Sequence, residues 1–307
     1  MAVPWGSWAV NTFFLLTGYL TVRNYKEGGI RFLLKRLCRL WPAFAASVLI
    51  TSGCMAIFMP ERLRSVVDIL LNFTMFPSYL GAQAVDGVYW TLPVELTFYF
   101  LIMLFMIGRK EKRFVGCLFI WSAVALVTNL LLKLGVNNAP IKLLQLLLVT
   151  ERAGCFILGA GICLANRRPA GKKWTVWLLF ALAIISGYLS QGWRVCLWNI
   201  GWGGLIWMVT SGKITFALGE KNLLHRCLIF LSAISYCLYL LHQFIGFAII
   251  SHIEQAGGLS QVWIIVPIAI SVALATLLHY FVERPAGEKL LTLTSGWFRD
   301  KKTLPSK

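Results

Sequence analysis

The amino-acid sequence predicts an all-α fold, a polytopic bundle of about nine transmembrane helices. Three observations lead to this prediction. Hydrophobic residues make up 58% of the 307-residue chain and charged residues 13%, whereas a soluble domain carries about 25% charged residues. About nine apolar segments approach the roughly 20 residues that a membrane-spanning helix needs. Basic residues are concentrated in every second loop between these segments, which is typical of a membrane protein.

The predicted spans follow one another along the whole chain. They cover approximately residues 8–22, 40–59, 90–108, 114–134, 142–165, 174–190, 195–211, 227–251 and 261–282. Because no long hydrophilic segment separates them, we expect one transmembrane domain over residues 1–307 and no attached soluble domain. Segment 60–89 is the longest exterior one. Its partly apolar stretch 66–80 predicts either an interfacial or re-entrant helix or an ordinary loop.

The distribution of Lys and Arg predicts the orientation of the chain in the membrane. Of the 29 basic residues, 23 lie in segments 23–39, 109–113, 166–173 and 212–226 and in the C-terminal tail. Five others lie in or next to the alternate loops, and Arg152 lies within a span. We therefore expect the basic segments and the C-terminus to face the cytoplasm from the plasma membrane. The net charge of +17 then indicates contacts with anionic lipids and no nucleic-acid partner.

The eight cysteines predict neither a metal site nor disulfides. All of them lie in or beside apolar segments, and no C-x-x-C motif occurs. We interpret them as small buried apolar residues. The spacing of His, Cys and carboxylate residues likewise predicts no metal site.

Glu95 is the only charged residue between positions 90 and 107. A buried ionised carboxylate costs several kcal/mol in hydrocarbon, so we expect Glu95 to be paired and to belong to a functional site. Tyr99 follows one helical turn later and shares its face. The alternative is a carboxylate that extends to the exterior surface.

Arg152 follows Glu151 in the otherwise apolar segment 141–164. It is predicted to bind Glu95 or an anionic ligand, and a purely structural ion pair is the alternative. Neighbouring helical residues point about 100° apart, so Glu151 and Arg152 need not pair with each other.

Two further groups of polar residues lie at or within the spans. Arg36 and Arg39 share one helix face at the cytoplasmic start of a span. They are predicted either to grip phosphates or to set topology beside lipid headgroups. Tyr239 and His242 lie on one stripe of a later span, where His242 is either a base or a satisfied packing residue. For His279 and Glu283 we favour a structural pair that ends the last span.

Six short motifs occur in order along nearly the whole chain. They are Phe13-Phe14-Leu15-Leu16-Thr17-Gly18-Tyr19-Leu20, Arg36-x-x-Arg39-Leu40-x-Pro42, Trp90-Thr91-Leu92-x-x-Glu95-x-x-Phe98-Tyr99, Arg152-x-x-x-Phe156-x-x-Gly159, Ser235-Tyr236-x-x-Tyr239-Leu240-x-His242 and Glu283-x-Pro285. Together they resemble the motifs of the acyltransferase family 3 membrane proteins.

This resemblance implies transfer of an acyl group, often acetyl, from cytoplasmic acyl-CoA to a hydroxyl of a cell-surface or lipid-linked glycan. The phosphates of acyl-CoA suit Arg36 and Arg39, with Arg152 as a further cation. Glu95, Tyr239 and His242 are then the candidate catalytic residues. The acceptor, the acyl chain and the oligomeric state stay open, a homo-oligomer included.

The resemblance also implies one helix more than this sequence contains. Family members begin with a further span that carries an Arg and, nearer its exterior end, a His taken to be the base. We expect nine of the ten family helices and, from this chain alone, little or no acyl transfer. His242 matches a different family position. The alternatives are an inactive truncated relative with a binding or assembly role, and a secondary transporter that uses Glu95 and Arg152 as a relay.

Overall fold

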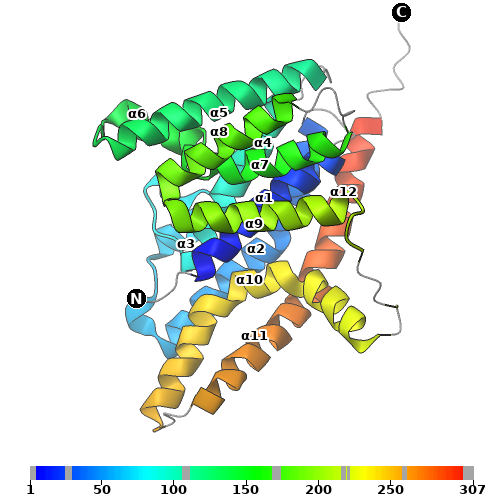
Figure 1. Ribbon diagram of the computed structural model, residues 1–307. Helices are drawn as coiled ribbons and strands as arrows, with labels where there is room; N and C mark the ends of the chain where they lie inside the picture. The colour runs from blue at the N-terminus through cyan, green and yellow to red at the C-terminus, as the bar shows by residue number, and fades with distance from the viewer. Residues whose placement is uncertain are drawn as a thin grey trace, which may run out of the picture. The chain divides into compact units, whose positions relative to one another are not determined.

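The structure, a computed structural model, describes residues 5–24, 30–105, 111–167, 174–215, 219, 222–257 and 261–299. All regular secondary structure in these residues is helical (Figure 1), which confirms the all-α prediction. The chain divides into two compact units. Unit 1 comprises Met1–Leu33 and Val94–Ala217, and unit 2 comprises Leu34–Pro93 and Leu218–Lys307. The single transmembrane domain predicted over residues 1–307 stays a prediction.

Unit 1 is assembled around one central helix, α7. Its helices are α1 (Trp5–Asn24), α4 (Thr91–Phe105) from Val94 onward, α5 (Glu111–Lys133), α6 (Ala139–Leu147), α7 (Thr150–Arg167), α8 (Trp174–Gln191) and α9 (Trp193–Thr210). Helix α7 packs against α1, α5, α6, α8 and α9. Consequently 14 of its 18 residues are buried.

Glycines bring α7 close to its neighbours. A Cβ atom added to Gly159 would lie 1.9 Å from the carbonyl oxygen of Leu15, and one added to Gly18 would lie 2.3 Å from that of Phe156. On the α8 side, a Cβ at Gly154 would lie 2.6 Å from the Ala183 carbonyl oxygen. Small residues allow this approach between membrane helices, and here they fix α7 against both α1 and α8.

The span predicted over 142–165 is not one continuous helix. The chain breaks between α6 and α7, where Val149 adopts a left-handed backbone with φ of 50°. This conformation is strained for a β-branched residue. Helix α5 holds the break, because the Trp121 indole donates to the Leu148 carbonyl (2.8 Å) and Asn129 donates to that of Thr150 (3.0 Å). Glu151 and Arg152 therefore lie in the first turn of α7 and not in the middle of a helix.

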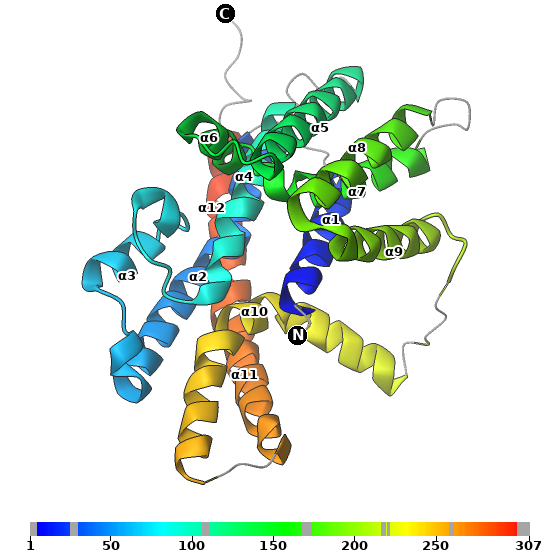
Figure 2. The same ribbon diagram turned by 60° about the vertical axis from the view of Figure 1, so that its left-hand side comes forward.

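Unit 2 contains the long helices α2 and α10. Its elements are α2 (Ile30–Phe58) from Leu34 onward, the short helices η1 (Pro60–Arg62), α3 (Val66–Asn72), η2 (Pro77–Leu80) and η3 (Gly87–Trp90), then α10 (Leu223–Gln255), η5 (Gln261–Ile264), α11 (Ile265–Leu278), the π-helical turn η6 (His279–Glu283) and α12 (Arg284–Arg299). Helices α10 and α11 run side by side in both ribbon views, and α10 bends near its middle (Figures 1 and 2).

The prediction that the last span ends at Glu283-Arg284-Pro285 is wrong. The chain continues through the π-helical turn η6 directly into α12. A proline in a continuing helix lacks an N–H and clashes with the carbonyl four residues earlier. The wider π turn before Pro285 gives the ring room, so the helix continues.

Seven helical segments in the described residues are long and apolar enough to cross a membrane: residues 30–58, 87–105, 113–133, 139–167, 174–191, 223–255 and 262–294. The predicted spans 8–22 and 195–211 correspond to α1 and α9. These helices are 20 and 18 residues long, but polar residues such as Asn11 and Asn199 dilute their apolar character. The membrane character is thus supported, whereas the count of about nine spans is not confirmed.

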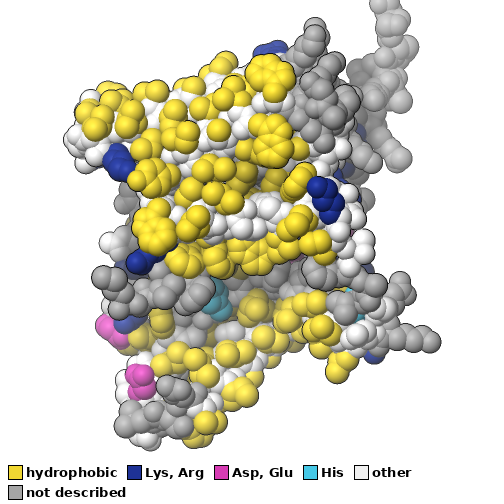
Figure 3. Space-filling model, viewed as in Figure 1, with side chains coloured by type: hydrophobic (Ala, Val, Ile, Leu, Met, Phe, Trp, Pro, Cys, Tyr) yellow, Lys and Arg dark blue, Asp and Glu magenta, His cyan; other side chains and the backbone are white. Residues whose placement is uncertain are grey.

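The surface of unit 1 fits a lipid environment. Figure 3 shows hydrophobic side chains over α8 and α9, with Lys and Arg at the edges of this face. Exposed apolar residues of α8 and α9 include Leu178, Ile185 and Ile200. In segment 60–89, helix α3 covers only seven residues of the stretch 66–80, for which either a helix or an ordinary loop was predicted. Much of basic segment 109–113 and the C-terminal tail from residue 300 lie outside the described residues, and the cytoplasmic orientation stays a prediction.

Candidate functional site

The six residues that the sequence singled out are divided between the units. Glu95 and Arg152 belong to unit 1, whereas Arg36, Arg39, Tyr239 and His242 belong to unit 2.

Glu95 and Tyr99 form the buried polar pair that their spacing predicted. Both side chains are buried on α4, and the Tyr99 hydroxyl donates a hydrogen bond to Oε1 of Glu95. The Tyr99 ring lies edge-on against Phe32, with ring centroids 5.9 Å apart. This packing keeps the hydroxyl directed at the carboxylate. Glu95 is thus a fixed acceptor in an apolar helix and does not extend to the surface.

Arg152 is held by oxygen atoms from three helices of unit 1. Its guanidinium donates to Oδ1 of Asn11 on α1 (2.9 Å) and to Oε1 of Gln191 at the end of α8 (2.7 Å). It also pairs with Glu151 of α7, with 2.9 Å between Nη2 and Oε1. Asn11 and Gln191 are linked to each other at 2.7 Å. The adjacent residues Glu151 and Arg152 therefore do pair, and the predicted contact of Arg152 with Glu95 stays a prediction.

An aromatic cavity lies beside this cluster along α1. Trp8 lines it one turn before Asn11, and Trp198 of α9 donates to the Trp8 carbonyl (2.9 Å) and the Thr12 hydroxyl (2.8 Å). The cavity has a volume of about 600 Å³. Its lining is Trp8, Trp193, Arg194, Leu197, Trp198, Gly201, Trp202 and Leu205. It is an open hollow whose lining is mainly apolar and aromatic.

In unit 2, Arg36 and Arg39 lie in the first third of α2. The Arg36 side chain is half-buried and that of Arg39 is exposed. Helix α12 passes close by, since a Cβ at Gly287 would lie 3.5 Å from the Cys38 carbonyl oxygen. The prediction that the two arginines share a helix face agrees with their placement on one continuous α-helix.

Tyr239 and His242 lie next to the segment that leads into α4. The Tyr239 hydroxyl donates to the Val88 carbonyl (2.9 Å) and lies 2.8 Å from the Thr91 hydroxyl. His242 is exposed, and its Nδ1 lies 2.9 Å from the Tyr239 carbonyl. Because a carbonyl only accepts, Nδ1 carries the proton and Nε2 is the basic nitrogen of the neutral ring.

Asp86 is a buried acidic residue that the sequence analysis missed. Its carboxylate accepts from the N–H groups of Val88 (3.1 Å) and of Phe244 within α10 (3.2 Å). A side chain that enters the backbone ladder is a recognised cause of helix bending, which agrees with the bend in α10. Burial raises the pKa of Asp86, against the lowering effect of these hydrogen bonds and of the nearby His242. The sequence signal that could have revealed Asp86 is a single acidic residue directly before an apolar segment.

The chain resembles known acyltransferases over most of its length. A family model for an acyltransferase domain, that of acyltransferase family 3, matches residues 1–280. The chain belongs to this family. Nodulation protein 10 of Rhizobium leguminosarum bv. viciae is 26% identical over 313 residues, which cover 90% of this chain and 81% of that relative. No solved structure matches the chain.

The match confirms the family that the six motifs predicted. All six predicted site residues of this acyltransferase fall inside the matched region, and Glu283 lies just beyond it. Acyl transfer needs a proton acceptor, groups that stabilise an oxyanion, and cations for an anionic donor. The Glu95 carboxylate, the Arg152 guanidinium and the pair formed by Arg36 and Arg39 are groups of these three kinds, in that order.

Asn11 and Gln191 were also missed from the sequence. Both are amides close to the ends of apolar segments, where a polar residue does not by itself indicate a functional site. Their role emerges only because the fold brings α1 and the end of α8 to the start of α7. Among the described residues, one further cluster has the composition of a metal site, namely Cys237, His279 and Glu283.

Proposed function

We propose that this acyltransferase moves an acyl group, acetyl in the simplest case, from cytoplasmic acyl-CoA to a hydroxyl of a cell-surface or lipid-linked glycan. The observation that carries the proposal is the buried Glu95 carboxylate, held by Tyr99 inside an apolar helix. Such a group is costly in a membrane protein and marks a functional site. The proposed setting is the plasma membrane, with the C-terminus in the cytoplasm.

The reaction is an attack of the acceptor hydroxyl on the thioester carbonyl. A C–O bond forms, the C–S bond breaks, and the hydroxyl proton passes to a base. Glu95 would accept a hydrogen bond from the acceptor hydroxyl, and Nε2 of His242 is a candidate for the base. Tyr239 would act through position, because its hydroxyl bonds to Val88 and Thr91 at the start of the Glu95 motif.

The cations divide into two proposed roles. Arg36 and Arg39 would bind the phosphates of the acyl-CoA donor, for which the planar guanidinium is well suited. Arg152 would stabilise negative charge near the acceptor, since Asn11 and Gln191 fix its orientation in advance. Preorganised donors of this kind are the most effective stabilisers of a developing oxyanion.

The aromatic cavity along α1 would receive the acceptor. Its four tryptophans offer flat apolar faces for a sugar ring or a lipid-linked glycan, and Arg194 is the charged residue at its edge. Replacing Trp202 with Ala should then raise the KM for the acceptor. Trp174→Ala is the matched control, because Trp174 is exposed on α8 and does not line the cavity.

The test uses purified full-length protein in liposomes with radiolabelled acetyl-CoA. This proposal replaces the sequence-based expectation of little or no transfer by this chain alone. It expects release of free CoA and ester-linked label in an added membrane glycan fraction. It also expects Arg36→Ala and Arg39→Ala to weaken acetyl-CoA binding by about 1.5–3 kcal/mol each, with only partial rescue by Lys. Absence of both products, or ion-driven solute uptake instead, would overturn the proposed function.

A further inference from the structure

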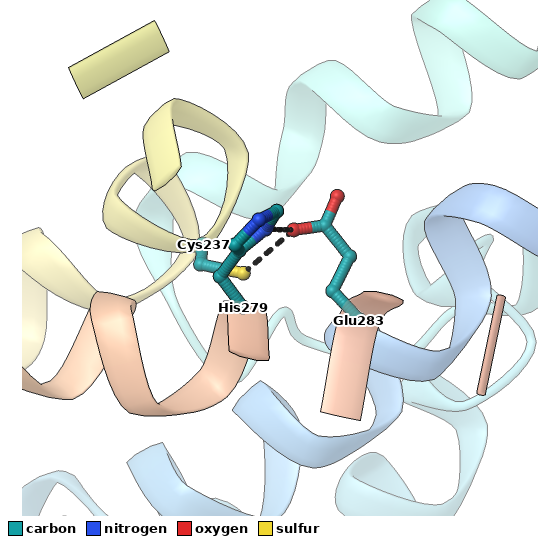
Figure 4. A group of neighbouring side chains, drawn as sticks. All are labelled: Cys237, His279 and Glu283. Carbon is teal, nitrogen blue, oxygen red and sulfur yellow. Dashed lines mark hydrogen bonds and ion pairs between the residues drawn. The ribbon is translucent and has the colours of Figure 1, made fainter. Parts of the chain in front are cut away.

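A polar cluster in unit 2 joins α10 to the π-helical turn η6 (Figure 4). The thiol of Cys237 lies 3.1 Å from Oε2 of Glu283, and Nδ1 of His279 lies 2.7 Å from the same oxygen. One ligand atom from each of the three residues lies within 4.8 Å of the other two. Two hydrogen-bond donors thus converge on a single carboxylate oxygen.

The cluster is shielded from solvent. Cys237 is fully buried and Glu283 is 8% exposed, while the His279 side chain is 16% exposed. A buried ionised carboxylate needs strong compensation, and a thiol is only a weak hydrogen-bond donor. A divalent cation bound by all three side chains would supply such compensation for the Glu283 carboxylate.

The local backbone favours convergence of the three side chains. His279 and Glu283 begin and end η6, where the Arg284 N–H bonds to the His279 carbonyl. Single π turns inside helices occur frequently at functional sites. Here the turn directs both side chains toward Cys237 on α10, as the close-up shows (Figure 4).

We propose that Cys237, His279 and Glu283 bind a divalent cation of borderline softness, with Zn²⁺ as the simplest case. A mixed set of sulfur, nitrogen and oxygen ligands suits this ion, and three protein ligands leave a fourth position for water or another ligand. None of the three residues is among those assigned to acyl transfer. The proposed cation site stands whether or not the proposed donor and acceptor are right.

Binding exchanges protons for the ion. The Cys237 thiol loses its proton to solvent, and the imidazole proton moves from Nδ1 to Nε2 if Nδ1 is the ligand. The carboxylate and thiolate then balance the two positive charges of the ion, so the buried site becomes neutral. The three ligand atoms must separate to roughly 3.3–3.7 Å for tetrahedral bonds, a small movement from the observed hydrogen-bonded distances.

This site was not predicted from the sequence. We expected no metal ligands and interpreted His279 and Glu283 as a structural pair, and their contact of 2.7 Å agrees with the pairing. The third residue, Cys237, lies on another helix, far from both in sequence. Spacing along the chain therefore does not reveal the cluster.

The test is Co²⁺ and Zn²⁺ binding to tag-free, chelator-stripped full-length protein in detergent. We expect about one ion per chain and, with Co²⁺, a thiolate-to-metal charge-transfer absorption. Cys237→Ser should abolish this absorption, and Glu283→Gln should weaken binding at least about tenfold. The matched control is Cys227→Ser, because Cys227 is exposed on the same helix and lies outside the cluster.

Two outcomes would overturn the proposal. One is folded wild-type protein that retains no ion at micromolar concentrations. The other is equal Co²⁺ affinity and absorption in wild type and Cys237→Ser. If Cys237→Ser does not fold, the measurements on Cys227→Ser test the metal site instead. That protein must show the thiolate absorption, and Zn²⁺ must raise its melting temperature.

Discussion

Helices α7 and α10 both carry candidate functional residues, but they are positioned in different ways. In α7, 14 of 18 residues are buried, and glycines seat the helix directly on the backbones of α1 and α8. In α10, 7 of 33 residues are buried, and its described polar contacts run to a few groups such as Asp86 and Glu283. Close backbone packing therefore positions helix α7, whereas α10 is positioned by packing against α11 together with a few polar tethers.

The largest effect is expected where packing is tightest. Gly159→Ala places a Cβ 1.9 Å from the Leu15 carbonyl oxygen, and a backbone atom cannot move away cheaply. The free energy of unfolding should fall by about 3 kcal/mol, measured by thermal denaturation in detergent. Gly116→Ala on α5 is the control, because its Cβ meets no atom within 4 Å. An equal effect of both variants would contradict the packing account of α7.

The next effect concerns the polar end of α7. Arg152→Met removes the donors that satisfy Asn11 and Gln191, and leaving buried acceptors unpaired costs about 1–3 kcal/mol. Arg152→Lys should restore part of this loss. The control is Arg194→Met, since Arg194 is exposed at the rim of the aromatic cavity. Wild-type stability of Arg152→Met would show that the cluster does not hold α7.

A smaller, pH-dependent effect is expected at the tether of α10. Asp86→Asn keeps one acceptor oxygen and should cost about 1 kcal/mol near pH 4. Burial raises the pKa of Asp86, so the native state holds its proton more tightly than the unfolded state. The stability from this group is therefore present below the unfolded pKa, about 3.9, and is lost as pH rises through the folded pKa. The cost of Asp86→Asn should shrink over the same range.

The control for this comparison is Asp68→Asn in helix α3. Hydrogen bonds from the Ser65 hydroxyl and the Gln83 N–H lower the pKa of Asp68. Its stabilising effect is thus present above the unfolded pKa and is lost as pH falls, which is the opposite sign. Identical profiles of stability against pH for wild type and Asp86→Asn would show that the ionisation of Asp86 does not affect stability.

The same contrast explains what the sequence could predict. Glu95 and Tyr99 were identifiable because one helical turn joins them, and the motifs were local enough to indicate the family. The partners of Arg152 come from α1 and α8, which lie about 140 and 40 residues away, and no local pattern encodes that contact. The break at Val149 also has no sequence signal, since neither Gly nor Pro occurs there. It depends on Trp121 and Asn129 of α5.

The tethers of α10 were hidden for a related reason. Asp86 lies in a loop and Glu283 in a motif interpreted as a helix end, while their partners Phe244 and Cys237 are apolar-looking residues of a span. Hydropathy predicted the helix correctly, because it depends on the average of many side chains. It could not predict which single residues of that helix meet a carboxylate.

The central claim is that the buried Glu95 carboxylate belongs to the acyl-transfer site, and Glu95→Gln tests it most directly. This variant keeps the shape of the side chain and removes its charge, and Glu61→Gln at an exposed position of the short helix η1 is the matched control. Transfer of labelled acetyl from acetyl-CoA should fall by at least about a hundredfold in Glu95→Gln, with acetyl-CoA affinity and melting temperature unchanged. Wild-type transfer by folded Glu95→Gln would contradict the account and leave Glu95 a structural partner of Tyr99.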